Sequence, residues 1–150
     1  MQVPVITAVS AATVAGMQQS ASLLPPSLFV ATVPAFAANA VRDRATKRQV
    51  DEFLGEMKTA GVKVDYVSTT VWDPGLLLVD ALRKLGTNAT PNQIRDQIAS
   101  LKGWVGADGP YDFVKFPNRG LGPDSLYVSQ WDAAKEAWVG VSGPGGTMLR

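Results

Sequence analysis

The sequence predicts an α/β fold in which parallel strands with flanking helices fill the first half and a hairpin-like β region forms the end. Three observations support this prediction. Apolar strand-like and helical runs alternate early, capping signals bound two later helices, and apolar and polar residues alternate between turns in the last third. The chain has 150 residues, of which 46% are hydrophobic, so it has the length of one domain and can bury a sizeable core.

The first 41 residues carry no charged side chain, and all 27 charged residues (14 basic and 13 acidic) follow them. Residues 3–9 and 28–33 are typical of strands buried on both faces, and residues 10–24 between them predict a helix. An export signal is not favoured, because a positively charged start is missing and Gln18 and Gln19 interrupt the apolar run. No apolar run reaches the roughly 18 residues of a membrane span. We therefore expect buried sheet and helix in this segment.

Residues 47–60 predict an amphipathic helix, since their apolar positions recur on one face and Gly61 suits a C-terminal cap. Residues 62–71 are expected to be partly extended. The next helix is expected to begin with Asp73 as N-cap and Pro74 at its first position, and to end at Gly86.

A third helix is predicted from the capping-box spacing of Thr90 and Gln93. Turn signals on either side of Phe113 predict a short strand there, and residues 126–131 and 137–141 are expected to pair as strands. Residues 143–146 look like a loose tail.

Composition narrows the possible functions. The net charge is +1 without a dense basic run, which argues against nucleic-acid partners. The chain has no Cys and no His, so thiolate metal sites and the commonest general base are excluded, and we expect no cofactor, no metal and no catalytic residues. A small hydrolase or sensor domain is therefore the least favoured interpretation.

Several short motifs together resemble one protein family. They are Trp72-Asp73-Pro74-Gly75 through Gly86, the Gly106-Ala107-Asp108-Gly109 turn, and Gln130-Trp131-Asp132. Their order resembles that of branched-chain amino-acid-type periplasmic binding proteins, the extracellular solute receptors of ABC importers, and the likeness covers nearly the whole chain. Because those receptors have two lobes and are much longer, the resemblance implies that this chain corresponds to their C-terminal part.

The resemblance also implies a division of the chain. Residues 1–66 would belong to the second lobe, residues 67–103 would supply first-lobe helices, and residues 104–150 would form a C-terminal β segment. Such a part leaves apolar surfaces uncovered, so we expect a homodimer or a segment-exchanged oligomer. The implied location is the periplasm.

Five residues are candidates for solute binding. Ser10 and Thr13 lie between a strand and a helix N-terminus, where free N–H groups favour an anion, although helix capping explains either one. Thr69 and Thr70 could donate hydrogen bonds to a solute, since they precede Trp72, whose position resembles that of an aromatic residue near the hinge between the lobes of the receptor family. Trp72 could stack on an apolar solute, although packing at the hinge is the favoured alternative.

The predicted function is non-catalytic binding of a small solute for delivery to an ABC permease. The uncharged first 41 residues offer no carboxylate for a ligand ammonium group, which favours an organic or aromatic carboxylate over an amino acid. The alternative is a stand-alone α/β interaction domain that dimerises through its apolar N-terminal third.

Overall fold

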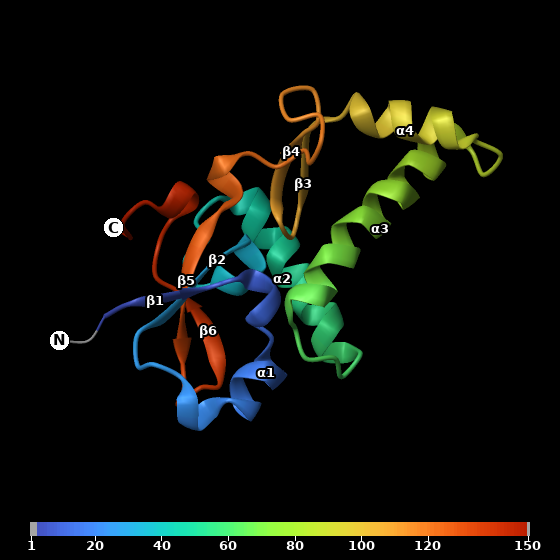
Figure 1. Ribbon diagram of the computed structural model, residues 1–150. Coiled ribbons are helices and arrows are strands. Elements are labelled where there is room, and N and C mark those ends of the chain that lie inside the picture. Colours follow the sequence, from blue (N-terminus) through green and yellow to red (C-terminus); the bar gives the residue numbers. More distant parts are fainter. Residues whose placement is uncertain (1–2, 150) are drawn as a thin grey trace.

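The computed structural model (Figure 1) describes residues 3–149, and its main element is a four-stranded sheet with the strand order β1-β2-β5-β6. Strands β1 and β2 run parallel, whereas β5 is antiparallel to both of its neighbours. The bounds are β1 Val5–Thr7, β2 Leu28–Thr32, β5 Tyr127–Asp132 and β6 Ala137–Gly140. The first and last parts of the sequence therefore share one sheet, which confirms a mixed α/β fold.

One face of this sheet is covered. Strand β5 alternates buried Tyr127, Ser129 and Trp131 with half-buried residues, as a strand covered on one side should. The covering comes from the connection between β1 and β2 and from the 3-10 helix Pro34–Ala37, whose Phe36 belongs to the same core cluster as Trp131. This face holds the main apolar core.

The prediction that residues 3–9 form a strand buried on both faces is wrong. Strand β1 lies at the sheet edge, where Val5 is 41% and Ile6 is 77% exposed. The helix predicted at residues 10–24 is also shorter than expected. It consists of a 3-10 turn at Val9–Ala11, helix α1 at Val14–Gln19 and another 3-10 turn at Ala21–Leu23. Thr13 starts α1 as its N-cap, which interrupts the longer helix because a capping residue has extended backbone geometry.

Helix α2 spans Arg44–Thr59, close to the predicted range. Its N-cap is Asp43, whose carboxylate accepts a hydrogen bond from the N–H of Thr46 at 2.8 Å. Val50 and Phe53 are completely buried, and Gly61 has the positive φ of 68° expected after a helix C-terminus. Helix α2 thus confirms the amphipathic prediction.

Helix α3 spans Tyr66–Leu85, so the prediction of a partly extended segment over residues 62–71 is wrong for its second half. The helix begins with a capping box in which Asp65 accepts from the N–H of Ser68 and Ser68 accepts from the N–H of Asp65. Asp73 is consequently not an N-cap, and Pro74 lies inside the helix. Gly86 ends the helix with a φ of 89°, as predicted.

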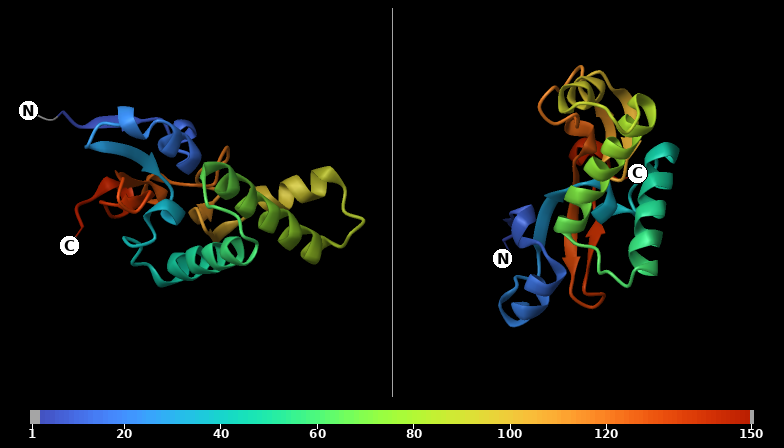
Figure 2. Two further views of the ribbon diagram at one scale, coloured as in Figure 1. Left: turned by 90° about the horizontal axis from the view of Figure 1, so that it is seen from below. Right: turned by 90° about the vertical axis from the view of Figure 1, so that its right-hand side faces the viewer.

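Helix α4, Pro91–Ala99, has the predicted capping box of Thr90 and Gln93. It is followed by a separate two-stranded hairpin of β3 Lys102–Gly106 and β4 Gly109–Asp112, so the strand expected near Phe113 ends just before that residue. Figure 2 shows α3 and α4 extending away from the four-stranded sheet.

Residues 143–146 are not a loose tail. They form the 3-10 helix Pro144–Gly146, and Gly145 donates a hydrogen bond to the carbonyl of Leu126 at 2.8 Å. Within residues 3–149, none of the helices is both long and apolar enough to span a bilayer.

Candidate functional site

Two of the predicted binding residues lie where β1 turns into α1, a region called here the β1–α1 corner (residues 7–16). Ser10 is exposed in the 3-10 turn that follows β1. Thr13 is half-buried, and its hydroxyl oxygen accepts a hydrogen bond from the N–H of Gly16 at 3.1 Å. Thr13 therefore has the capping role that sequence reasoning favoured, and its hydroxyl proton is still able to donate to another group.

The first turn of α3 lies beside this corner. Tyr66 packs against the core cluster that contains Ala12 and Met17, together with Val9 and Val14 from the corner itself. The starts of α1 and α3 therefore border the same apolar core (Figure 1).

Both threonines of α3 bind their own helix. Thr69 is 2% exposed, and its hydroxyl donates to the carbonyl of Tyr66 at 3.0 Å. Thr70 is exposed, and its hydroxyl donates to the carbonyl of Val67 at 2.8 Å. Thr70 can accept a further hydrogen bond from a solute, whereas the burial of Thr69 places it behind the surface.

Trp72 is half-buried and packs inside the molecule. Its ring centroid lies 5.4 Å from that of Phe53 on α2, and it borders the core cluster that contains Ala35 and Ala107. This contact joins α2 to α3 at the base of the helical extension. Packing, the alternative that sequence reasoning favoured, is the role that these contacts give Trp72.

The most polar buried site in the described residues surrounds Asp73, which is completely inaccessible to solvent. Its carboxylate accepts hydrogen bonds from the N–H groups of Ala107 and Asp108, each at 2.9 Å, and from the hydroxyl of Tyr111 at 3.0 Å. We call these four residues the Asp73 cluster. It fastens the β3–β4 turn to the middle of α3.

The backbone of the hairpin comes very close to this carboxylate. A Cβ atom placed on Gly106 would lie 2.2 Å from a carboxylate oxygen of Asp73, so any larger residue at this position would displace it. The sequence marked Gly106 to Gly109 as a turn but gave no sign of its partner, because 34 residues separate Asp73 from Ala107. Sequence reasoning placed Asp73 at a helix start and so missed its role as a buried acceptor inside α3.

Burial changes the charge state of this cluster. Desolvation raises the pKa of Asp73, against three hydrogen bonds that favour its ionised form. Desolvation and, second, the nearby charge of Asp73 raise the pKa of Asp108 to about 7. One oxygen of the Asp108 carboxyl group is buried without a hydrogen-bond partner, which agrees with a neutral, protonated group below pH 7.

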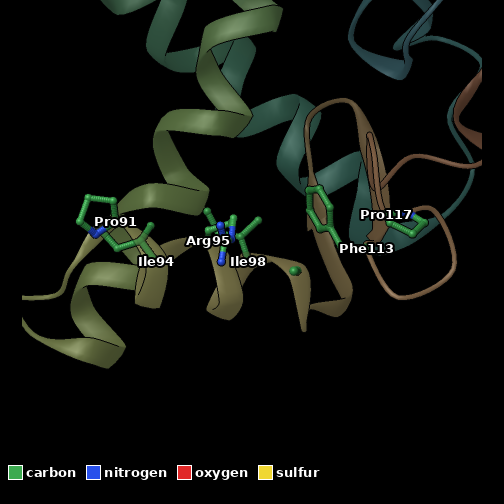
Figure 3. A pocket seen from close by; sticks show the side chains of 7 residues that line it. Pro91, Ile94, Arg95, Ile98, Phe113 and Pro117 are labelled. Carbon is green, nitrogen blue, oxygen red and sulfur yellow. The ribbon is translucent and has the colours of Figure 1, made fainter.

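A separate apolar hollow of about 480 Å³ lies between α4 and the loop that follows β4 (Figure 3). Its one charged lining residue, Arg95, forms an ion pair with Asp96 at 3.0 Å. The hollow has none of the predicted solute-binding residues in its lining. The residues that line it are Pro91, Ile94, Arg95, Ile98, Ala99, Phe113 and Pro117.

Comparison with known proteins identifies the type of fold. No family model and no curated protein matches the chain. A protein of Rhodopseudomonas palustris strain CGA009 has a similar structure, with a TM-score of 0.75 and 16% identity over 93% of this chain and 41% of the other. Two extracellular ligand-binding receptors of Rhodopseudomonas palustris HaA2 give TM-scores of 0.71 and 0.74, also at 16% identity.

The chain has the fold of part of an extracellular ligand-binding receptor. It covers 41% and 40% of the two HaA2 receptors, so it spans about two-fifths of their length. The resemblance read from the sequence is thereby confirmed for the fold.

Proposed function

We propose that this chain is the C-terminal part of a non-catalytic receptor that binds a small solute in the periplasm and delivers it to the permease of an ABC importer. The observation that carries the proposal is the agreement of its fold with extracellular ligand-binding receptors over 93% of its length. In this proposal residues 1–66 and 67–103 belong to two lobes that close on the solute, and residues 104–150 complete the β structure.

The proposed solute site is the β1–α1 corner together with the start of α3. Ligands of open α/β sheets bind at the carboxyl ends of strands, and Ser10 and Thr13 follow the carboxyl end of β1. We assign Thr69, Thr70 and Trp72 of α3 to the same site. Thr70 is the exposed one of the three, so its hydroxyl is the group proposed to reach the solute.

The proposed solute is an organic or aromatic carboxylate and not an amino acid, because the acidic side chains near this site are not available to a ligand ammonium group. A ligand ammonium group needs an available carboxylate, and the acidic residues at the N-cap and in the first half of α3 are already engaged in hydrogen bonds. Asp73 accepts three hydrogen bonds from the hairpin, and Asp65 caps α3. The hydroxyl and N–H groups at the corner suit an anion instead.

Isothermal titration calorimetry with benzoate and with leucine, on the longest form of the receptor that the gene encodes, tests the proposal. We expect benzoate to bind and leucine to bind at least about tenfold more weakly. Ser10→Ala should weaken benzoate binding about tenfold, since it removes one hydrogen bond to a charged group. The matched control Ser22→Ala, in an exposed turn away from the corner, should bind like the wild type.

The possible outcomes separate the parts of the proposal. Tighter binding of leucine than of benzoate would refute the choice of solute. Unchanged binding by the Ser10→Ala variant would refute the site. A receptor that binds neither compound nor any member of a panel of small carboxylates would refute the function.

A further inference from the structure

The β3–β4 turn (residues 106–109) packs against two connections of the chain. The chain leaves the four-stranded sheet through residues 33–43, which join β2 to α2, and returns to it through residues 113–126, which join β4 to β5. A Cβ atom placed on Gly109 would lie 2.9 Å from the hydroxyl oxygen of Ser125 and 3.7 Å from Cγ of Pro34. Pro34 belongs to the first connection and Ser125 to the second, and both are buried. The turn therefore contacts both connections at once.

The same turn is fastened to α3. The backbone N–H groups of Ala107 and Asp108 donate to the buried carboxylate of Asp73, one to each oxygen. The turn thus links the middle of α3 to the two connections through which the sheet is joined to the helices. Its position controls how freely the sheet and the helices can move relative to each other.

The side chain of Asp108 is buried in this junction without a partner of its own. It is 7% exposed, and one of its carboxyl oxygens is buried without a hydrogen bond. Within residues 3–149, none of the ion pairs involves it. The carboxyl group is therefore isolated from both water and positive charge.

The charged group that faces Asp108 is the carboxylate of Asp73 on α3. On β4 the nearby titratable group is the hydroxyl of Tyr111, which stays neutral because burial raises the pKa of Tyr111. The side chains that α2 and the first connection pack against the turn are apolar, with Phe53 and Ala35 in one cluster with Ala107. Ionisation of Asp108 would therefore place a second negative charge beside Asp73 with no cation to offset it.

We propose that the β3–β4 turn is a proton-operated latch on the two connections. With Asp108 neutral, the turn stays on Asp73, Pro34 and Ser125 and holds the sheet and the helices in one arrangement. With Asp108 ionised, the turn opens locally, which brings the carboxylate into water, releases the two backbone hydrogen bonds to Asp73 and frees both connections to bend. The latch depends on the fold of this chain alone and not on the proposed function.

The pH dependence has a defined sign. Burial, and second the charge of Asp73, raise the pKa of Asp108 from 3.8 to about 7 in the closed latch, whereas an opened turn exposes the carboxyl group to water. The closed latch is therefore fully favoured below pH 4 and loses stability as the pH rises towards 7. Between pH 5 and pH 8 the opened population should rise about a hundredfold.

Amide hydrogen exchange on the chain at pH 5 and pH 8, expressed as protection factors, tests the latch. We expect the protection of the Ala107 and Asp108 amides to fall about a hundredfold at pH 8. The amides of Phe36 and Ser125, whose N–H groups donate within the connections, should fall in step with them. Low concentrations of urea should leave these rates nearly unchanged and accelerate exchange in β2 and β5, because local opening exposes little surface and global unfolding exposes much.

Variants identify the titrating group. Asp108→Asn replaces the carboxyl group with a neutral group of the same shape, so the protection factors of the turn should agree within about threefold at pH 5 and pH 8. The matched control Asp96→Asn removes a carboxylate of α4 that is 69% exposed and paired with Arg95. This control should keep the pH dependence of the wild type.

Three results would overturn the latch. The first is an Asp108→Asn variant that keeps the pH dependence of the wild type. The second is exchange in the turn with the rate and urea dependence of β2 and β5, because global unfolding alone would then expose it. The third is a pH-dependent turn beside connections whose protection does not change. Failure of benzoate to bind would refute the proposed solute and leave the latch standing, since these measurements use no solute.

Discussion

The four-stranded sheet and the β3–β4 hairpin are held in place by different interactions. The sheet is fixed to its covering segments by large apolar side chains: Trp131 and Trp138, which pair on adjacent strands with ring centroids 5.4 Å apart, share a core cluster with Met17 and Phe36. The hairpin is fixed to α3 by the carboxylate of Asp73 and its three hydrogen bonds. Apolar packing tolerates changes of similar volume, whereas a buried polar cluster is sensitive to loss of its shared acceptor, because the donors then stay buried and unsatisfied.

The largest expected effect comes from Asp73→Ala, which leaves three buried donors without an acceptor. We expect a loss of about 5 kcal/mol, from roughly 1–3 kcal/mol for each donor. Hydrogen exchange should show faster exchange of the amides of Ala107 and Asp108, while β2 and β5 stay protected. The control is Asp80→Ala, since Asp80 accepts a hydrogen bond from Trp104 at 2.9 Å on the exposed part of the same helix. Its expected cost is about 1 kcal/mol or less, and equal costs for both variants would contradict the comparison.

The second prediction concerns pH. The pKa of Asp108 is raised from 3.8 to about 7 in the folded chain, so folding binds a proton between these values. Ionisation of the buried Asp108 carboxyl group lowers the free energy of unfolding. This loss is absent below pH 4, grows as the pH rises, and is complete above pH 7 at about 4 kcal/mol. Asp108→Asn removes this loss. Urea unfolding at pH 4.5, 6 and 8 should therefore show a growing stabilisation of the variant over the wild type, and parallel pH profiles would show that the Asp108 carboxyl group is not the cause.

The sheet provides the third prediction. Leu28 is 4% exposed in the core of the covered face, and Leu28→Ala should destabilise the chain by about 3 kcal/mol through lost burial and the cavity left behind. Leu23→Ala is the matched control, because Leu23 is 84% exposed and its replacement should change stability by about 0.5 kcal/mol or less. Chemical denaturation measures both. If Leu28→Ala made the hairpin amides exchange faster and left the sheet amides protected from hydrogen exchange, the result would contradict the separate stabilisation of the sheet and the β3–β4 hairpin.

The smallest effect is expected for Tyr111→Phe, which removes one of the three donors to Asp73 and keeps the aromatic contacts of Tyr111 with Trp104 and Phe113. We expect a loss of about 1.5 kcal/mol, the lower end for a hydrogen bond to a charged group. Double-mutant cycles with Asp73→Ala should show that the two losses are not additive, since both remove the same interaction. Additive losses would show that the hydroxyl of Tyr111 contributes independently of Asp73.

Local signals in the sequence predicted those elements whose ends depend on neighbouring residues. The capping box at Thr90, the positive φ values of Gly61 and Gly86, and the apolar face of α2 follow from contacts within a few residues. The start of α3 was missed although Asp65 and Ser68 have capping-box spacing, because Asp73 and Pro74 also look like a helix start. Tertiary contacts decided between the two signals.

The remaining errors concern partners that are distant in sequence. The apolar run around Val5 and Ile6 predicts a strand, but its position at the sheet edge depends on which strands lie beside it. The candidate site stays a prediction. Its hydroxyl groups could be named from the sequence, whereas the burial of Thr69 and the packing of Trp72 depend on α2 and the core.

The pairing of β2 with β5 has a consequence for synthesis of the chain. Phe29 pairs with Gln130, so β2 leaves the ribosome about 100 residues before the strand that completes its sheet. At roughly 5–20 residues per second, this delay lasts about 5–20 s, during which the apolar β2 segment has no antiparallel partner. Helices α2, α3 and α4 and the hairpin depend mainly on local contacts, so we expect them to form in that interval, before the sheet that starts with β1 and β2 is complete.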